Sequence, residues 1–107
     1  MALSLLSPRG LLDLIASGRP AMIEFYSPVC PHCAALEPVL EEIAQEWGDR
    51  VAIAQVDVLE NPRVAQDWTV MGTPTVIFFR NSAEVARLTG VQGKRQYERE
   101  LKTITEE

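Results

Sequence analysis

A run of strand-forming residues leads almost directly into the only two cysteines of this chain, and this succession constrains the fold more than any other feature. Residues 21–26 are apolar apart from Glu24 and predict a buried strand. Cys30 and Cys33 follow at the expected start of a helix, with Pro31 and His32 between them. A cysteine pair at this spacing can close a small disulfide ring and open it again. It can therefore exchange two electrons with the thiols of another molecule.

Helices and strands alternate along the rest of the chain. The pattern predicts helices from Pro8 to Gly18, from Cys30 to Gly48, from Pro62 toward Trp68 and after Gly93, and strands over residues 51–56, 75–79 and 84–88. Strand–helix–strand units imply parallel pairing, and a turn at residues 81–82 adds an antiparallel hairpin. The predicted fold class is therefore α/β, with three layers, a mixed central sheet of four to five strands and four helices.

Apolar residues at helical spacing predict which helix faces are buried. These residues are Leu11, Leu12 and Ile15 in the first helix, Leu36, Leu40, Ile43 and Trp47 in the second, and Tyr97, Leu101 and Ile104 in the last. Trp47 lies on such a stripe and is interpreted as a core residue. Pro38 falls inside the second helix and is expected to kink it, because proline lacks the amide donor and crowds the preceding turn.

Length and composition favour one domain over residues 1–107, and 47% of the residues are hydrophobic, which is enough for a core. The net charge of −5 offers no electrostatic reason to bind nucleic acid or an anionic membrane. The apolar N-terminus is short and lacks the early basic residues of a signal peptide. We therefore expect a cytoplasmic monomer, and in a reducing compartment a Cys-x-x-Cys pair is more often catalytic or metal-binding than structural.

Several features recur together at the spacing of one family. The strand over residues 23–26, the cysteine pair, Pro38, Asn61-Pro62, the run Gly72-Thr73-Pro74-Thr75 and Gly90 all agree with it. On these residues the chain resembles the thioredoxin family over nearly its whole length, which implies a thioredoxin fold and thiol–disulfide exchange.

The residues around the cysteines depart from the family pattern. Ordinary thioredoxins carry Trp-Cys-Gly-Pro-Cys, whereas this chain has Val29-Cys30-Pro31-His32-Cys33. The Pro-His pair is similar to that of the oxidising DsbA-type proteins, but 107 residues cannot hold their helical insertion. The combination resembles atypical thioredoxins.

The predicted nucleophile is Cys30. A cysteine at a helix N-terminus faces unpaired backbone amides and the positive end of the helix dipole, and both favour the thiolate. Pro31 suits the first helical position, where no amide donor is lost. Cys33 lies about one turn further on and is positioned to resolve a mixed disulfide. His32, when protonated, adds positive charge beside the sulfur, which predicts a more oxidising couple than that of a Gly-Pro thioredoxin.

The resemblance also assigns a buried acid and a substrate-binding loop. Glu24 occupies the position of the buried aspartate that accepts a proton near the resolving cysteine, and a buried carboxyl group is expected to have a raised pKa. Gln55 stands where thioredoxins have a lysine beside that acid, so this partner is missing.

Pro74 is expected to follow a cis peptide bond, and Thr73 before it to offer backbone hydrogen bonds to an extended substrate segment. Val29, Gly90 and Trp68 complete the predicted substrate-binding surface, together with Met71 and Val91.

The leading functional hypothesis is a protein-disulfide reductase that acts on protein disulfides and is recharged by thioredoxin reductase. The runner-up is a DsbA-like oxidase or isomerase. Outside catalysis, a thioredoxin-fold binding subunit and a metal site remain open, although the two thiolates and His32 give three ligands where structural zinc takes four. The chain lacks Gly-x-Gly-x-x-Gly, so no flavin or nicotinamide cofactor is predicted.

Overall fold

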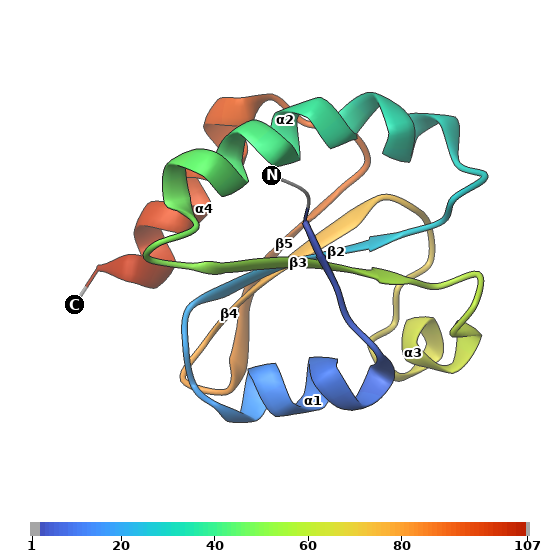
Figure 1. Ribbon diagram of the computed structural model, residues 1–107, viewed down its shortest axis with the longest axis horizontal. Helices are drawn as coiled ribbons and strands as arrows, with labels where there is room; N and C mark the ends of the chain where they lie inside the picture. The colour runs from blue at the N-terminus through green and yellow to red at the C-terminus, as the bar shows by residue number, and fades with distance from the viewer. Residues whose placement is uncertain (1–2, 107) are drawn as a thin grey trace.

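The computed structural model describes residues 3–106, in which a central sheet lies between two pairs of helices (Figure 1). The elements are β1 (Ser4–Leu5), α1 (Pro8–Ala16), β2 (Ala21–Tyr26), α2 (Pro31–Trp47), β3 (Ala52–Asp57), α3 (Pro62–Asp67), β4 (Thr75–Arg80), β5 (Ala83–Thr89) and α4 (Lys94–Thr105). In Figure 1, α2 and α4 cover one face of the sheet and α1 and α3 the other. No helix within the described residues is both long and apolar enough to span a membrane.

The sheet has five strands in the order β1-β3-β2-β4-β5 within the described part of the chain. The pairs β1–β3 and β3–β2 are parallel, and β2–β4 and β4–β5 are antiparallel. The expected mixed sheet with four helices is confirmed, and the observed bounds differ from the predicted ones by a residue or two. The predicted order began with a helix and was wrong there, because β1 precedes it. A strand of two residues is too short to produce a periodic pattern.

The first helix shows one error in the predicted core. Ser7 caps α1 by accepting a hydrogen bond from the Gly10 amide, and Pro8 occupies the first turn. Leu11 and Ile15 are buried, but Leu12 is 57% exposed. The residues one turn apart share a face, whereas the neighbour of Leu11 is rotated by about 100° toward solvent.

Alternate residues of the central strands pack into two separate cores. Met22 and Phe78 face α2 and α4, while Ile23 and Phe79 face α1 and α3. This alternation is the ordinary pleat of a strand buried on both faces. Because Glu24 is two residues after Met22, its side chain enters the core beneath α2.

The longest helix, α2, begins immediately after Cys30 and continues through Pro38 to Trp47. Its buried residues are Cys33, Leu36, Leu40, Ile43 and Trp47. The predicted stripe is therefore confirmed, Trp47 is a core residue, and the same stripe carries the second cysteine into the interior.

The hairpin between β4 and β5 contains an irregularity that changes which residues share a face. Asn81 and Ser82 both have positive φ, 55° and 65°, as in the two-residue turns that match strand twist. The register then shifts, since Phe79 pairs with Glu84 but Phe78 pairs with Ala86. Val85 is the extra residue of a β-bulge.

Two neighbouring leucines test the assignment of the buried face of α1. Leu11→Ala should lower the free energy of unfolding by about 2–5 kcal/mol, because it leaves a cavity in the core. Leu12→Ala should change it by no more than about 0.5 kcal/mol, because that side chain is exposed. Urea unfolding followed by circular dichroism measures both values. Equal losses would contradict the placement of the two side chains.

Candidate active site

The first cysteine lies at the junction between the sheet and α2. The chain leaves β2 at Tyr26 and turns so that Cys30 becomes the N-cap of α2, with φ −95° and ψ 112°. The Cys33 amide donates a hydrogen bond to the Cys30 sulfur over 3.2 Å. Pro31 occupies the first helical position. Both thiols are free, and Cys30 is half-buried.

The pKa of the Cys30 thiol is lowered from its ordinary value. Partial burial acts in the opposite direction, but hydrogen bonds from the Cys33 and Thr73 side chains and from the backbone amides of Cys33 and His32 favour the anion and prevail. His32 itself is exposed and contributes through its backbone amide. The accessible sulfur is therefore the one that ionises more easily.

The second cysteine has the opposite environment. Cys33 is only 5% exposed, and burial raises its pKa to about 11, with its hydrogen bond to the Cys30 side chain acting in the same direction. At neutral pH this thiol keeps its proton. The pair therefore combines an accessible thiol that ionises more easily with a buried thiol that keeps its proton.

One carboxyl group is buried beneath this end of α2. Glu24 is 3% exposed, and its Oε1 accepts a hydrogen bond from Gln55 Nε2 over 3.4 Å. Its Oε2 is buried with no hydrogen-bond partner among the described residues. Burial, with the nearby charges of Glu37 and Cys30 acting in the same direction, raises the pKa of Glu24 to about 7. A carboxyl group with this pKa gains and loses its proton in the neutral range.

The loop before β4 lies directly against the first cysteine. The Thr73–Pro74 peptide bond is cis. The Cys30 thiol donates to the Thr73 carbonyl oxygen over 3.5 Å. The Gly90 amide donates to the Pro74 carbonyl over 2.8 Å, and the Thr75 hydroxyl donates to the Gly72 carbonyl over 2.7 Å. These contacts bring together segments that are far apart in the sequence.

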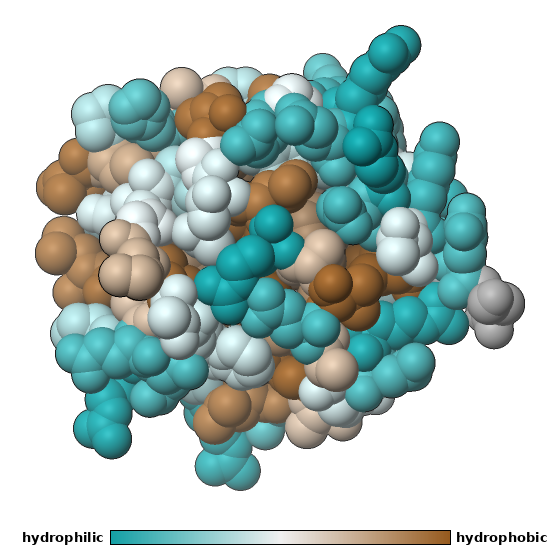
Figure 2. Space-filling model, turned by 180° about the vertical axis from the view of Figure 1, so that it is seen from behind, coloured by the Kyte–Doolittle hydropathy of each residue, from teal (hydrophilic) through white to brown (hydrophobic). Residues whose placement is uncertain are grey.

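Exposed apolar side chains lie on the segments around Cys30 and the Thr73–Pro74 loop. Val29, Met71 and Val91 are 74%, 92% and 46% exposed. Figure 2 shows the molecule from behind, so its left edge corresponds to the right edge of Figure 1, where β2 connects to α2. Hydrophobic residues gather at this edge. The segment 71–73 lies between two hollows of about 260 and 450 Å³, both of which it lines.

Trp68 is joined less closely to this surface. It is half-buried, and its ring packs edge-on against Phe79 with the ring centroids 5.3 Å apart. The aromatic ring therefore contributes to the core beneath α1 and α3.

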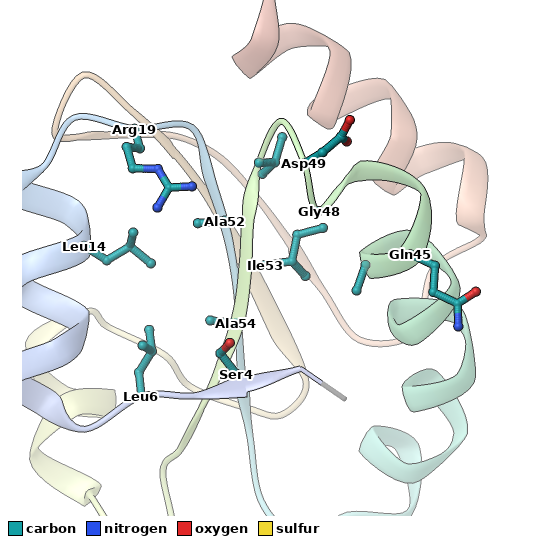
Figure 3. Close-up of a pocket in the computed structure, with 12 residues that line it drawn as sticks. Ser4, Leu6, Leu14, Arg19, Gln45, Gly48, Asp49, Ala52, Ile53 and Ala54 are labelled. Carbon is teal, nitrogen blue, oxygen red and sulfur yellow. The ribbon is translucent and has the colours of Figure 1, made fainter. Parts of the chain in front are cut away.

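A larger hollow lies away from this site. A space of about 650 Å³ is bounded by α1, β1, β3 and the end of α2, and Figure 3 shows Leu14, Arg19 and Asp49 on its walls. None of the predicted site residues lines it. Within residues 3–106, no three His, Cys, Asp or Glu side chains gather in a way that would hold a metal ion.

Two contacts near the site were missed by sequence reasoning. One is the hydrogen bond from Gln55 to Glu24, for which the sequence offered only the position of Gln55. The other joins Arg87 and Glu84 to the end of α3. Nothing in the spacing of these two residues indicated that they meet, because residues three apart on a regular strand face opposite sides.

The family model for thioredoxin matches residues 11–103 of the chain. A thioredoxin from Mycolicibacterium smegmatis is 42% identical over 91 residues, which cover 83% of this chain and 81% of that protein. A bifunctional thioredoxin reductase/thioredoxin from Mycobacterium leprae is 35% identical over 86% of this chain and 20% of its own length. Among solved structures, a variant thioredoxin from Halobacterium salinarum matches with a TM-score of 0.88 and 28% identity, covering 99% of this chain and 92% of that one.

The raised pKa of Glu24 predicts how stability depends on pH. Between the ordinary value of 4.5 and the folded value of about 7, the folded protein keeps a proton that the unfolded chain has lost. Stability contributed by this group is therefore complete below pH 4.5 and lost as pH rises to about 7, a difference of about 3 kcal/mol. Glu24→Gln removes the titrating group. The free energy of unfolding of the variant should therefore rise relative to that of the wild type as pH increases over this range.

Urea unfolding of the reduced proteins between pH about 4.5 and 7.5 tests this expectation. Glu60→Gln serves as the control, because Glu60 is exposed and its substitution should leave the pH dependence unchanged. A constant difference between wild type and Glu24→Gln across the range would show that Glu24 ionises in the folded protein as easily as in the unfolded chain.

Proposed function

The chain belongs to the thioredoxin family, and we propose that it reduces disulfide bonds in other proteins through the Cys30–Cys33 pair. As a thioredoxin-type protein it is a thiol–disulfide oxidoreductase. The observation that carries the proposal is the contrast between the two cysteines. Cys30 is accessible and has a lowered pKa, whereas Cys33 is buried and has a pKa of about 11.

The reaction proceeds in two exchanges. The Cys30 thiolate attacks one sulfur of the substrate disulfide, and the other substrate sulfur leaves as a thiolate that takes up a proton. Cys33 then loses its proton and attacks the Cys30 sulfur of the mixed disulfide. The Cys30–Cys33 disulfide forms, the second substrate sulfur leaves as a thiolate, and two electrons have passed to the substrate.

Glu24 is the proposed acceptor of the Cys33 proton. A thiol with a pKa of about 11 is almost entirely protonated at neutral pH, so the second exchange requires a base. A carboxyl group with a pKa of about 7 is partly ionised under the same conditions. Gln55 supports this role, because it hydrogen-bonds one carboxylate oxygen and adds no positive charge that would hold the group ionised.

Substrate proteins are proposed to dock across Thr73 and Pro74. An extended segment of the substrate adds to the Thr73 backbone as a further strand would, which places its disulfide next to Cys30. Val29 and Gly90 flank this position, and the half-buried Trp68 extends it. The apolar side chains around the pair contribute buried area that does not depend on one substrate sequence.

The Pro31-His32 dipeptide supports a couple that is less reducing than that of ordinary thioredoxins. Hydrogen bonds and positive charge that stabilise the Cys30 thiolate stabilise the reduced form, which raises the reduction potential above the value of about −270 mV typical of thioredoxin. On this account the protein is an atypical thioredoxin that still transfers electrons to its substrates. A DsbA-like oxidase would show a potential near about −120 mV instead.

Thioredoxin reductase is the proposed electron donor. The bifunctional protein of Mycobacterium leprae carries both activities in its name and matches this chain over a fifth of its length, 20%. We propose a cytoplasmic location, where a reducing environment keeps such a cysteine pair in its dithiol form.

Reduction of insulin with dithiothreitol as the electron source tests the function. The wild type should accelerate the reduction, and Cys30→Ser should abolish the acceleration because the attacking sulfur is missing. Cys33→Ser should accumulate a mixed disulfide with the substrate. An inactive wild type would favour a role as a binding subunit.

The contribution of His32 is tested by the reduction potential. His32→Pro removes both the imidazole and the backbone amide that contacts the Cys30 sulfur, and it should lower the potential. His32→Gln keeps the amide and removes only the titratable ring, so it should lower the potential by less. Titration against glutathione measures all three proteins, and potentials that stay the same or rise would exclude this role.

A further inference from the structure

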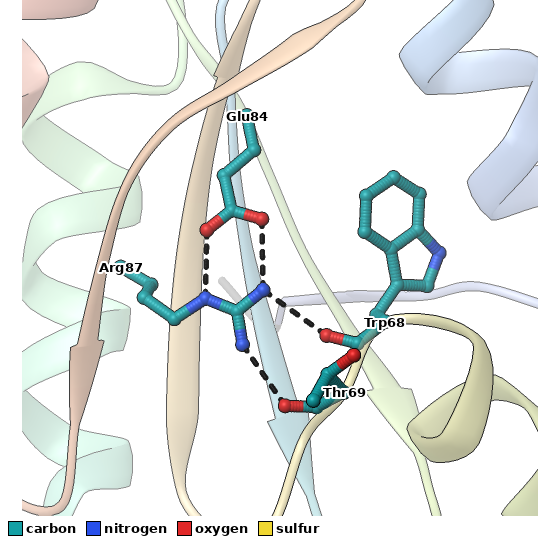
Figure 4. Close-up of polar contacts among 4 residues, drawn as sticks. All are labelled: Trp68, Thr69, Glu84 and Arg87. Atoms are coloured by element: carbon teal, nitrogen blue, oxygen red, sulfur yellow. Dashed lines mark hydrogen bonds and ion pairs between the residues drawn. The ribbon is translucent and has the colours of Figure 1, made fainter.

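The clearest unexplained polar cluster joins the edge strand β5 to the end of α3. Arg87 donates to both carboxylate oxygens of Glu84, from Nε over 2.7 Å and from Nη2 over 2.8 Å (Figure 4). The same guanidinium donates from Nη2 to the Trp68 carbonyl over 3.0 Å and from Nη1 to the Thr69 carbonyl over 3.1 Å. The bidentate ion pair fixes the plane of the guanidinium, and the remaining donors face two successive carbonyls.

The β-bulge is what allows this cluster to form. Residues 84 and 87 would face opposite sides of a regular strand. The register shift at Val85 pairs Glu84 with Phe79 and Arg87 with Ile77, two residues that face α1 and α3. Both charged side chains therefore lie on the face where α3 ends.

Trp68 and Thr69, whose carbonyls accept these hydrogen bonds, begin the loop that passes beside Cys30. We define the docking segment as residues 68–74. It begins at the C-cap of α3, where Thr69 has a positive φ of 52°, and it ends at the cis bond before Pro74. Its far end is held by the hydrogen bond from the Gly90 amide to Pro74. Between these two attachments, Met71 is 92% exposed and Gly72 is exposed as well.

We propose that Arg87, oriented by Glu84, is a positioning residue that holds the docking segment in the conformation that binds substrate proteins. The inference rests on the proposed function and extends it to a residue that touches neither sulfur. Without Arg87, the segment keeps its attachment near Pro74 and the backbone hydrogen bonds that its first amides donate to α3. The Trp68 and Thr69 carbonyls, however, lose the guanidinium that holds them to β5. The exposed part at Met71 and Gly72 then samples more conformations, and a substrate must order it on binding.

If Arg87 and Glu84 formed only a surface ion pair, substituting Arg87 would have a different effect. Exposed ion pairs contribute little to stability, and their loss affects no particular step. Arg87 and Glu84 are about 30% exposed, at 29% and 30%, and the guanidinium also satisfies two backbone carbonyls. Its effect is therefore confined to the segment that those carbonyls belong to.

Steady-state insulin reduction separates these possibilities. Arg87→Met should raise KM about fivefold, the factor expected for losing roughly one net hydrogen bond, with kcat changed less than about twofold. The rate with a small aromatic disulfide, which needs no docking segment, should also change less than about twofold. The control is Arg9→Met, which removes the exposed Arg9–Asp13 ion pair from α1 and should leave every parameter unchanged.

Arg87→Lys distinguishes geometry from charge. A lysine keeps the positive charge but cannot make the forked contacts to a carboxylate and two carbonyls, so its KM should resemble that of Arg87→Met. A KM equal to that of the wild type would show that charge alone acts, and it would overturn the proposal. If Arg87→Met does not fold, Arg87→Lys and Glu84→Gln carry the same comparison.

Amide hydrogen exchange tests the positioning without relying on activity. Exchange at residues 69–73 should accelerate in Arg87→Met and Arg87→Lys, while exchange in β2 and α2 should match the wild type. An unchanged exchange rate in this segment, or equal changes in KM and in the small-disulfide rate, would overturn the proposal. A wild type that does not reduce insulin would instead reject the proposed function, and the exchange data would still decide whether Arg87 holds the segment.

Discussion

The antiparallel pairing of β2 with β4 is the contact on which the site depends. It places Phe25 opposite Thr75, so the chain that enters the Cys30 turn lies beside the chain that leaves Pro74. The Cys30 sulfur consequently lies 3.5 Å from the Thr73 carbonyl, although 43 positions separate the two residues. Because the middle strands are buried on both faces, sliding this pairing by one residue would turn the side chains of one strand into the opposite core.

The chemical contrast within the cysteine pair follows from the start of α2. Cys30 precedes the helix and receives the Cys33 amide, one of the donors that a helix leaves without an internal partner. Cys33 is the first residue of the buried stripe that continues through Leu36 and Leu40. One turn of helix therefore separates a thiol stabilised as an anion from one that burial keeps protonated. The amphipathic pattern that packs α2 on the sheet also sets which of the two sulfurs ionises more easily.

Sequence reasoning succeeded where the signal was local or periodic. The pattern of α2, the strand over residues 21–26 and the helix starts at Pro8 and Pro62 gave most elements to within a residue or two. It failed for β1, which is too short to have a period, and for Leu12, which neighbours a core residue but lies outside the buried face. The contact between Arg87 and Glu84 could not be predicted, because a pattern that assumes regular strands does not indicate a bulge at Val85.

The sequence by itself determined the fold class, the position of the cysteine pair at a helix start and the presence of one acid in a buried strand, because each depends on residues adjacent along the chain or one helical turn apart. Tertiary structure alone decided the distance from Cys30 to Thr73, the hydrogen bond from Gln55 to Glu24 and the attachment of the loop after α3. These depend on register between strands and on how deeply a side chain is desolvated. Such quantities exist only after distant segments have packed together.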